Sequence, residues 1–145
     1  MSYEEVLQQL NASSRNTFME TLGIVYTDFT GSSLTAELEV SPKLYQPMGF
    51  LHGGVSLSIA ETVGSVLSLT SINPEEFYVF GTQVNGYHLQ SVQSGKLRAT
   101  AKFIHIGNTS QIIEIEIFNE TLLTQTFKNC HVTMTNRIVA KKEFK

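Results

Sequence analysis

One long, nearly uncharged helical segment limits what this chain can fold into. Residues 53–72, GGVSLSIAETVGSVLSLTSI, place apolar side chains at helical spacing and carry a single charge, Glu61. Ala60 and Gly64 are small enough to let a sheet approach closely, and Pro74 lies just beyond the end of the segment. A helix this apolar needs cover over most of its circumference, which predicts a sheet wrapped around it.

Alternating apolar and polar residues predict strands on both sides of this helix. Residues 24–29 and 34–40 form a hairpin before it, and the chain after residue 77 is nearly all strand with short turns. The expected later strands are 77–90, 96–106, 111–119 and 121–136. The pattern predicts an α+β fold, with a roughly six-stranded antiparallel sheet wrapped around one long central helix. The outer edges of that sheet would need pairing with another subunit.

The length of 145 residues predicts one domain, residues 1–145. A short N-terminal helix over about 2–12 begins with Ser2 and Glu5, the spacing of a capping box. The last nine residues, RIVAKKEFK, hold four of the ten basic side chains. We expect this stretch, 137–145, to be a flexible, solvated tail.

Charge and cysteine content exclude several classes of function. A net charge of −3 gives no basic face for nucleic acid. The single cysteine, Cys130, excludes an internal disulfide, and the histidines show no metal-ligand spacing, so we expect no metal site. The N-terminus lacks the pattern of a signal peptide, and the stretch 53–72 is too polar for a membrane span. These features predict a soluble cytoplasmic protein without a membrane partner.

The start of the helical segment, His52-Gly53-Gly54, is a candidate binding site. Glycines let a ligand approach the backbone, and the first N–H groups of a helix have no partner within it. Such an N-terminus stabilises an anionic thioester or phosphate oxygen. The alternative is that the glycines only permit a tight turn against a neighbouring strand.

Glu61 is the second candidate, because nothing else between Lys43 and Glu75 is charged. We expect its carboxylate to be buried, with a raised pKa or with hydrogen-bond donors such as Ser65, four residues on. Glu61 lies about 12 Å along the helix from Gly53, so the two can meet at one ligand only across a subunit boundary, where a second helix runs antiparallel. The alternative is an exposed glutamate on the solvent face of the helix.

Three stretches together, QPMGFLHGGVSLSIAETVGS, GTQVNGYH and IHIGNTSQIIEIEIFN, resemble the hotdog-fold acyl-CoA thioesterases. The likeness runs from about Asn16 to Thr135 and is greatest for the phenylacetate-type subgroup, including the bacterial 1,4-dihydroxy-2-naphthoyl-CoA thioesterases. The resemblance implies a hotdog fold, a homodimer or dimer of dimers, and active sites at the dimer interface.

The same resemblance implies a role for each candidate. Glu61 would be the catalytic carboxylate, which attacks the thioester carbonyl or activates water. The amide of Gly53, from the other protomer, would hold the thioester oxygen. Gln46 would orient the thioester or the water, Ser65 would support the glutamate, and His52 would shape the pocket.

Coenzyme A would be part of the substrate, so the resemblance implies no separate cofactor. The residues that it places against coenzyme A are Gly81, His88, Leu89, Gln90, Ser91, His105, Ile106, Gly107, Asn108, Thr109 and Ser110. The subgroup often has arginine where this chain has Gln90 and Thr109. Backbone amides or the side chains of His88, His105 and Lys102 would then have to bind the phosphates.

The leading hypothesis is an acyl-CoA thioesterase that acts on an aromatic or medium-chain acyl group. The pocket around Met48, Val55 and Ser58 would select that group. A second hypothesis is a hotdog hydratase or dehydratase, in which His52 and Glu61 act on an acyl thioester. A third is a non-catalytic acyl-CoA-binding protein.

Overall fold

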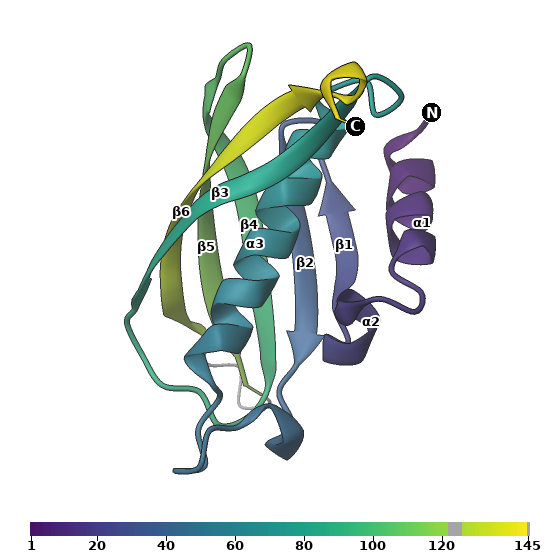
Figure 1. Ribbon diagram of the computed structural model, residues 1–145. Coiled ribbons are helices and arrows are strands. Elements are labelled where there is room, and N and C mark those ends of the chain that lie inside the picture. Colours follow the sequence, from purple (N-terminus) through teal and green to yellow (C-terminus); the bar gives the residue numbers. More distant parts are fainter. Residues whose placement is uncertain (122–125, 145) are drawn as a thin grey trace.

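The computed structural model describes residues 1–121 and 126–144. Two short helices come first, α1 (Tyr3–Ser13) and α2 (Phe18–Leu22), and α1 packs beside the first strand (Figure 1). The hydroxyl of Ser2 accepts a hydrogen bond from the Glu5 N–H, and the Glu5 carboxylate accepts one from the Ser2 N–H. The capping box predicted from the sequence is therefore confirmed. Short 3-10 turns lie at Pro42–Leu44 and Lys141–Glu143.

Within the described residues, six strands form one antiparallel sheet in the order β1-β2-β4-β5-β6-β3 (Figure 1). Their bounds are Val25–Phe29 (β1), Ser33–Glu39 (β2), Phe77–His88 (β3), Lys96–Ile106 (β4), Ser110–Glu120 (β5) and Thr126–Ala140 (β6). The predicted α+β architecture is confirmed. Of the last predicted strand, residues 122–125 lie outside the described part of the chain.

The central helix, α3 (Gly53–Thr70), crosses one face of the curved sheet and contacts β2 to β6 (Figure 1). Ile59, Val63 and Leu67 on this helix are fully buried. Gly64 is needed for the close approach, because a Cβ atom there would lie 2.3 Å from the sulfur of Met134 on β6. No helix within residues 1–121 and 126–144 is long and apolar enough to cross a membrane.

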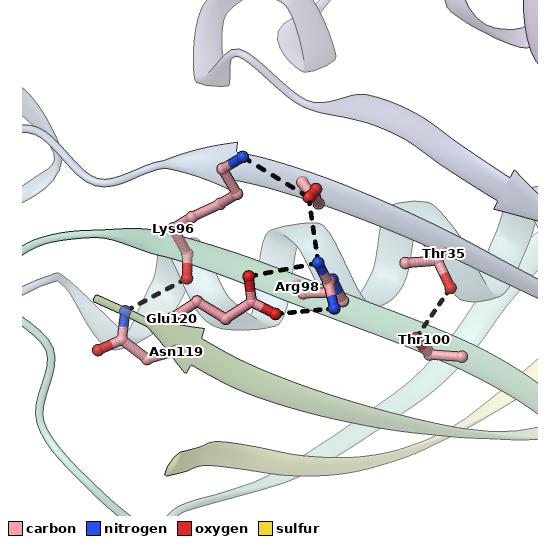
Figure 2. Close-up of polar contacts among 7 residues, drawn as sticks. Thr35, Lys96, Arg98, Thr100, Asn119 and Glu120 are labelled. Carbon is pink, nitrogen blue, oxygen red and sulfur yellow. Dashed lines mark hydrogen bonds and ion pairs between the residues drawn. The ribbon is translucent and has the colours of Figure 1, made fainter. Parts of the chain in front are cut away.

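The sheet face away from α3 is polar. Arg98 on β4 forms ion pairs with Glu120 at 2.7 Å and with Glu37 at 3.8 Å (Figure 2). Beside them, the hydroxyls of Thr35 and Thr100 lie 2.9 Å apart (Figure 2). Ion pairs this exposed stabilise a fold by about 0–1 kcal/mol each. The apolar face beneath α3 therefore fixes the strand register, since a slip of one residue would turn it outward.

Strand β3 lies at one edge of the sheet. It pairs with β6 on one side, and no strand in the described residues pairs with its other side. Its twelve residues therefore present a row of backbone N–H and C=O groups to a further strand. Tyr78 and Phe80 on this strand are 40% and 42% exposed, which is unusual for large aromatic side chains.

The prediction of a flexible tail from residue 137 is wrong for residues 137–144. Strand β6 continues to Ala140, and Ile138 within it is buried. The Ile138 N–H also donates to the Thr109 carbonyl at 2.8 Å. The ring of Phe144 then stacks on Phe80 with centroids 5.3 Å apart. These apolar contacts hold a segment whose basic residues alone indicated a solvated tail.

Candidate active site

An open cleft of about 420 Å³ lies at the N-terminal end of α3. Its lining residues are Gln46, Met48, Phe50, Leu51, Gly53, Ser56, His88, Leu89, Gln90, Ser91, Val92 and Asn129. The cleft thus brings together two sets of predicted site residues. The first is Gln46 and Gly53, which were predicted to contact the thioester. The second is segment 88–91, which was predicted to bind coenzyme A. Glu61 does not line it.

His52 is the N-cap residue of α3 and leaves one backbone amide free. Its ring nitrogen Nδ1 accepts a hydrogen bond from the Gly54 N–H at 2.8 Å, and its carbonyl accepts one from the Val55 N–H at 2.9 Å. No group in the described part of the chain accepts a hydrogen bond from the Gly53 N–H. This amide, at the positive end of the helix dipole, faces a cleft where a ligand oxygen can bind it.

Gln46 supplies a second donor to the same cleft. Its side-chain oxygen Oε1 accepts a hydrogen bond from the Met48 N–H within a tight turn that Gly49 completes at φ 88°. With the oxygen used in this way, the amide nitrogen Nε2 of Gln46 is oriented as the free donor. Two donors, the Gly53 N–H and the Gln46 amide, therefore belong to residues that line the same cleft, and donors of this kind stabilise an oxyanion.

Asn129 fastens segment 88–91 to α3. Its side chain is 4% exposed, accepts a hydrogen bond from the Ser56 hydroxyl at 2.9 Å and donates one to the Gln90 carbonyl at 2.7 Å. The ladder between β5 and β6 pairs Ile117 with Cys130 and then Phe118 with Lys128, so Asn129 is the extra residue of a β-bulge. A bulge re-aims a side chain, and here it turns Asn129 inward next to the cleft. No pattern in the sequence indicates a functional role for Asn129.

His88 lies directly against the start of α3. A Cβ atom on Gly53 would be 3.0 Å from the His88 ring carbon Cε1, so a side chain here would require the exposed His88 ring to shift slightly. The structure therefore places His88 beside the free amide, at the same end of the helix as Gln90. The sequence left two interpretations of the glycine pair, a close approach to a neighbouring strand and an amide that is free to bind a ligand. Gly53 shows both features.

We expected the Glu61 carboxylate to be buried, but in the single chain Glu61 is exposed, as the alternative interpretation of this residue had it. Its carboxylate lies over β3, with Oε1 3.3 Å from the position that a Cβ atom on Gly81 would take. Ser65 forms no hydrogen bond with it in the described residues. Strand β3 is the edge of the sheet, so the described residues provide no further strand to cover Glu61 beyond it.

The second predicted coenzyme A segment, 105–110, lies at the other end of the molecule. It forms the turn between β4 and β5, beyond the C-terminal end of α3 (Figure 1). Next to it, the Gln111 side chain donates to the Ser71 hydroxyl at 3.0 Å. The 18 residues of α3 span about 27 Å. One chain therefore cannot bring segments 88–91 and 105–110 to the same end of one ligand.

Two other kinds of reactive site can be checked in the described residues, a cysteine nucleophile and a metal centre. Burial raises the pKa of the Cys130 thiol, which keeps it protonated and unreactive at neutral pH. Within residues 1–121 and 126–144, no three His, Cys, Asp or Glu side chains are grouped as metal ligands.

Comparison with known proteins gives the class of the chain. The sequence profile of the thioesterase superfamily matches residues 48–125, more than half of the chain. The protein belongs to this superfamily and is a thioester hydrolase. This confirms the resemblance seen in the sequence.

Particular relatives are similar over most of the chain. The 1,4-dihydroxy-2-naphthoyl-CoA hydrolase of Listeria monocytogenes is 40% identical over 118 residues, 81% of this chain and 95% of that one. The proofreading thioesterase EntH of Klebsiella pneumoniae is 42% identical over 117 residues, 81% of this chain and 85% of that one. A crystal structure of a mutant thioesterase from Pseudomonas aeruginosa superposes with a TM-score of 0.86 at 34% identity, covering 92% of this chain and 94% of that one.

Proposed function

We propose that the protein hydrolyses acyl-CoA thioesters at sites built from two copies of the chain. The observation that carries this proposal is the separation of the parts. The cleft at Gly53 holds free donors but no carboxylate, whereas Glu61 lies about 12 Å farther along the same helix. A thioester hydrolase needs both at one carbonyl group.

The open edge of β3 supports a specific arrangement of the two copies. If β3 of one protomer pairs antiparallel with β3 of its partner, a two-fold axis also sets the two α3 helices antiparallel. The N-terminus of each helix then approaches the Glu61 half of the other. The homodimer completes two sites, and the exposed Glu61 becomes covered. A dimer of dimers would repeat the same unit.

In such a site the carbonyl oxygen of the thioester accepts hydrogen bonds from the Gly53 N–H and the Gln46 amide. The carboxylate of Glu61, from the partner, attacks the carbonyl carbon or takes a proton from attacking water. The products are a free carboxylic acid and the thiol of coenzyme A. Loss of one oxyanion donor of this kind costs on the order of a hundredfold in kcat.

The two predicted coenzyme A segments fit the same two-chain arrangement. Segment 88–91 lies beside the Gly53 end of one protomer, and segment 105–110 lies beyond the Glu61 half of the helix. Antiparallel helices bring segment 88–91 of one chain towards segment 105–110 of the other, so a single coenzyme A can reach both. Gly81 lies on the Glu61 side of this site.

The name of one relative suggests an aromatic acyl group. The relative from Listeria is named for 1,4-dihydroxy-2-naphthoyl-CoA, which we propose as the first substrate to test, with other aromatic and medium-chain acyl-CoAs beside it. The hydratase alternative requires His52 as a base, but its Nδ1 lone pair is engaged by the Gly54 N–H, so the ring proton lies on Nε2. The cytoplasmic location and the lack of a separate cofactor stay predictions from the sequence.

The test is release of free thiol from a panel of aromatic, short and long acyl-CoAs. We expect Glu61→Gln to fold normally and to lose most of kcat, because an amide is neither a base nor an effective nucleophile. Glu75→Gln, an exposed glutamate outside the site, is the matched control and should retain full activity. Near wild-type turnover by Glu61→Gln would refute the assignment of the carboxylate.

A further inference from the structure

Three aromatic rings contact one another where the C-terminus meets the edge strand. Tyr78 and Phe80 lie on β3, and Phe144 follows the 3-10 turn beside the first residues of that strand (Figure 1). The Phe144 ring stacks on Phe80 with centroids 5.3 Å apart and lies edge-on to Tyr78 at 5.4 Å. All three residues are between 40% and 55% exposed. Large apolar side chains gathered in this way, here called the aromatic cluster, mark a binding surface, whereas single ones do not.

An arginine without an acidic partner lies directly beside the aromatic cluster. Arg137 on β6 is paired with Phe80 on one side and with Ser110 on the other. Directly opposed residues of antiparallel strands point to the same face of the sheet, with Cβ atoms about 4.5–5.5 Å apart. The next residue, Ile138, is buried, so this row of three faces away from α3. Arg137 is exposed and forms no ion pair with any described residue.

The turn that ends at Ser110 adds further hydrogen-bond donors. It is fixed against β6, because the Thr109 carbonyl accepts a hydrogen bond from the Ile138 N–H at 2.8 Å. In residues 1–121 and 126–144, no group accepts a hydrogen bond from the backbone N–H of Asn108 or Thr109, or from the Ser110 hydroxyl. A guanidinium, a hydroxyl and free turn amides are the donors that bind phosphate groups in proteins.

This combination suits a nucleotide better than a second protein surface. A purine base stacks on aromatic rings, and a phosphate pairs with arginine through two N–H groups. An apolar protein surface seated here would instead bury the Arg137 charge without a partner, which is costly. A two-fold contact between two copies of the aromatic cluster would bring two Arg137 charges together. The nearby Glu75 and Glu76 line a separate groove with Lys141 and Lys142, to which Arg137 does not belong.

We propose that the aromatic cluster and Arg137 bind the nucleotide end of coenzyme A. The adenine base stacks on the rings, and a phosphate group of the nucleotide pairs with the Arg137 guanidinium. The identity of the ligand rests on the proposed function, which makes an acyl-CoA the substrate. The site also adjoins segment 105–110, which the proposed function already places against coenzyme A.

The two-chain active site leaves this part of β3 open. Within one chain Gly81 lies against Glu61, and His88 lies against Gly53. When Gly53 of a second copy reaches Glu61, His88 of that copy therefore comes close to Gly81. Strand β3 of the second copy ends at His88, so the residues of β3 that precede Gly81, including Phe80, lie beyond its end. The arm of coenzyme A that leads away from the thioester can pass at this open edge.

The experiment measures binding of adenosine 3′,5′-bisphosphate, which carries the base and phosphates without the thiol arm, by isothermal titration calorimetry. Arg137→Gln should weaken binding roughly tenfold or more, because a charge-assisted contact is lost. Its binding should also depend less on salt concentration than that of the wild type. Phe144→Leu, which keeps an apolar side chain but removes the ring, should weaken binding as well. KM for acyl-CoA should rise in both variants.

Arg15→Gln is the matched control. Arg15 is exposed, forms no ion pair with a described residue and lies between α1 and α2, so this variant should bind the bisphosphate as the wild type does. Equal weakening by Arg137→Gln and Arg15→Gln, or an unchanged salt dependence in Arg137→Gln, would overturn the phosphate contact.

Two further outcomes decide the proposal. If Phe144→Leu changes the molecular mass in solution and leaves bisphosphate binding intact, the aromatic cluster is an interface between copies and the nucleotide site is refuted. A wild type that does not bind the bisphosphate refutes it too. A wild type that binds the bisphosphate but releases no thiol from any acyl-CoA would support the nucleotide site and refute the proposed function.

Discussion

Replacing Asn129 with alanine tests how the structure holds segment 88–91 beside the cleft. The substitution removes the bonds to the Gln90 carbonyl and the Ser56 hydroxyl, at 2.7 and 2.9 Å. Each buried group left without a partner costs about 1–3 kcal/mol. Because Gln90 is exposed, its carbonyl can regain a bond from water, so we expect the lower part of that range for it. The free energy of unfolding should fall by about 2–4 kcal/mol in total.

Urea denaturation at fixed protein concentration measures the fall in the free energy of unfolding, and the rate of thiol release at several acyl-CoA concentrations measures KM. We expect KM for acyl-CoA to rise, because segment 88–91 is no longer fastened to α3. Asn119→Ala is the matched control. Asn119 is 1% exposed and donates to the carbonyls of Ser94 and Lys96 at 3.0 and 3.3 Å. Figure 2 shows the bond to Lys96, and Asn119 does not line the cleft. It should lose similar stability and keep its KM. A loss below about 0.5 kcal/mol for Asn129→Ala, or equal KM changes in both variants, would refute the reasoning.

Two further predictions concern stability. Gly95→Ala should lower the free energy of unfolding by more than about 1 kcal/mol, because Gly95 has φ 84° and a Cβ there would lie 2.1 Å from the Glu120 carbonyl oxygen; an unchanged urea midpoint would contradict this. The hydrogen bond from Lys128 holds the pKa of Glu116 below its usual 4.5. A depressed folded pKa means that the stabilisation is complete above about pH 4.5 and is lost as the pH falls through the folded value. Lys128→Met should flatten the fall in stability in that acidic range, and parallel pH curves for the two proteins would show the pairing to be unimportant.

The sequence predicted the fold well because the fold follows from local patterns. Apolar alternation along Ile113, Ile115 and Ile117 identified a strand with one buried face, and all three are fully buried. The prediction of a flexible tail at 137–145 was wrong because it rested on the basic residues of this segment and not on its apolar alternation. Ile138 continues the spacing of Val132 and Met134, and that spacing was the better guide to residues 137–140.

The site was predicted only in part, for physical reasons. The helix start at His52 and Gly53 is a local feature, so the sequence locates it. The exposure of Glu61 depends on how α3 lies relative to the edge of the sheet, which no local pattern specifies. Asn129 leaves no signal in the sequence, because the bulge that turns it inward depends on the pairing with β5.

The central claim is that each active site uses Gly53 of one chain and Glu61 of another. Gly53→Pro removes the amide donor, and proline suits the first position of a helix after His52, whose ψ is 130°. Gly53→Ala is its control, since it adds the same Cβ near His88 but keeps the N–H. Gly53→Pro and Glu61→Ala chains should each be inactive alone.

The most direct measurement is the activity of mixed dimers of these two inactive chains. Differently tagged chains are co-expressed, and the mixed species is quantified before thiol release is measured. With random pairing, half of the dimers are mixed and each contains one intact site, so about a quarter of wild-type activity should return. No activity in a preparation proven to contain mixed dimers would mean that the site is built within one chain, and the account would be wrong.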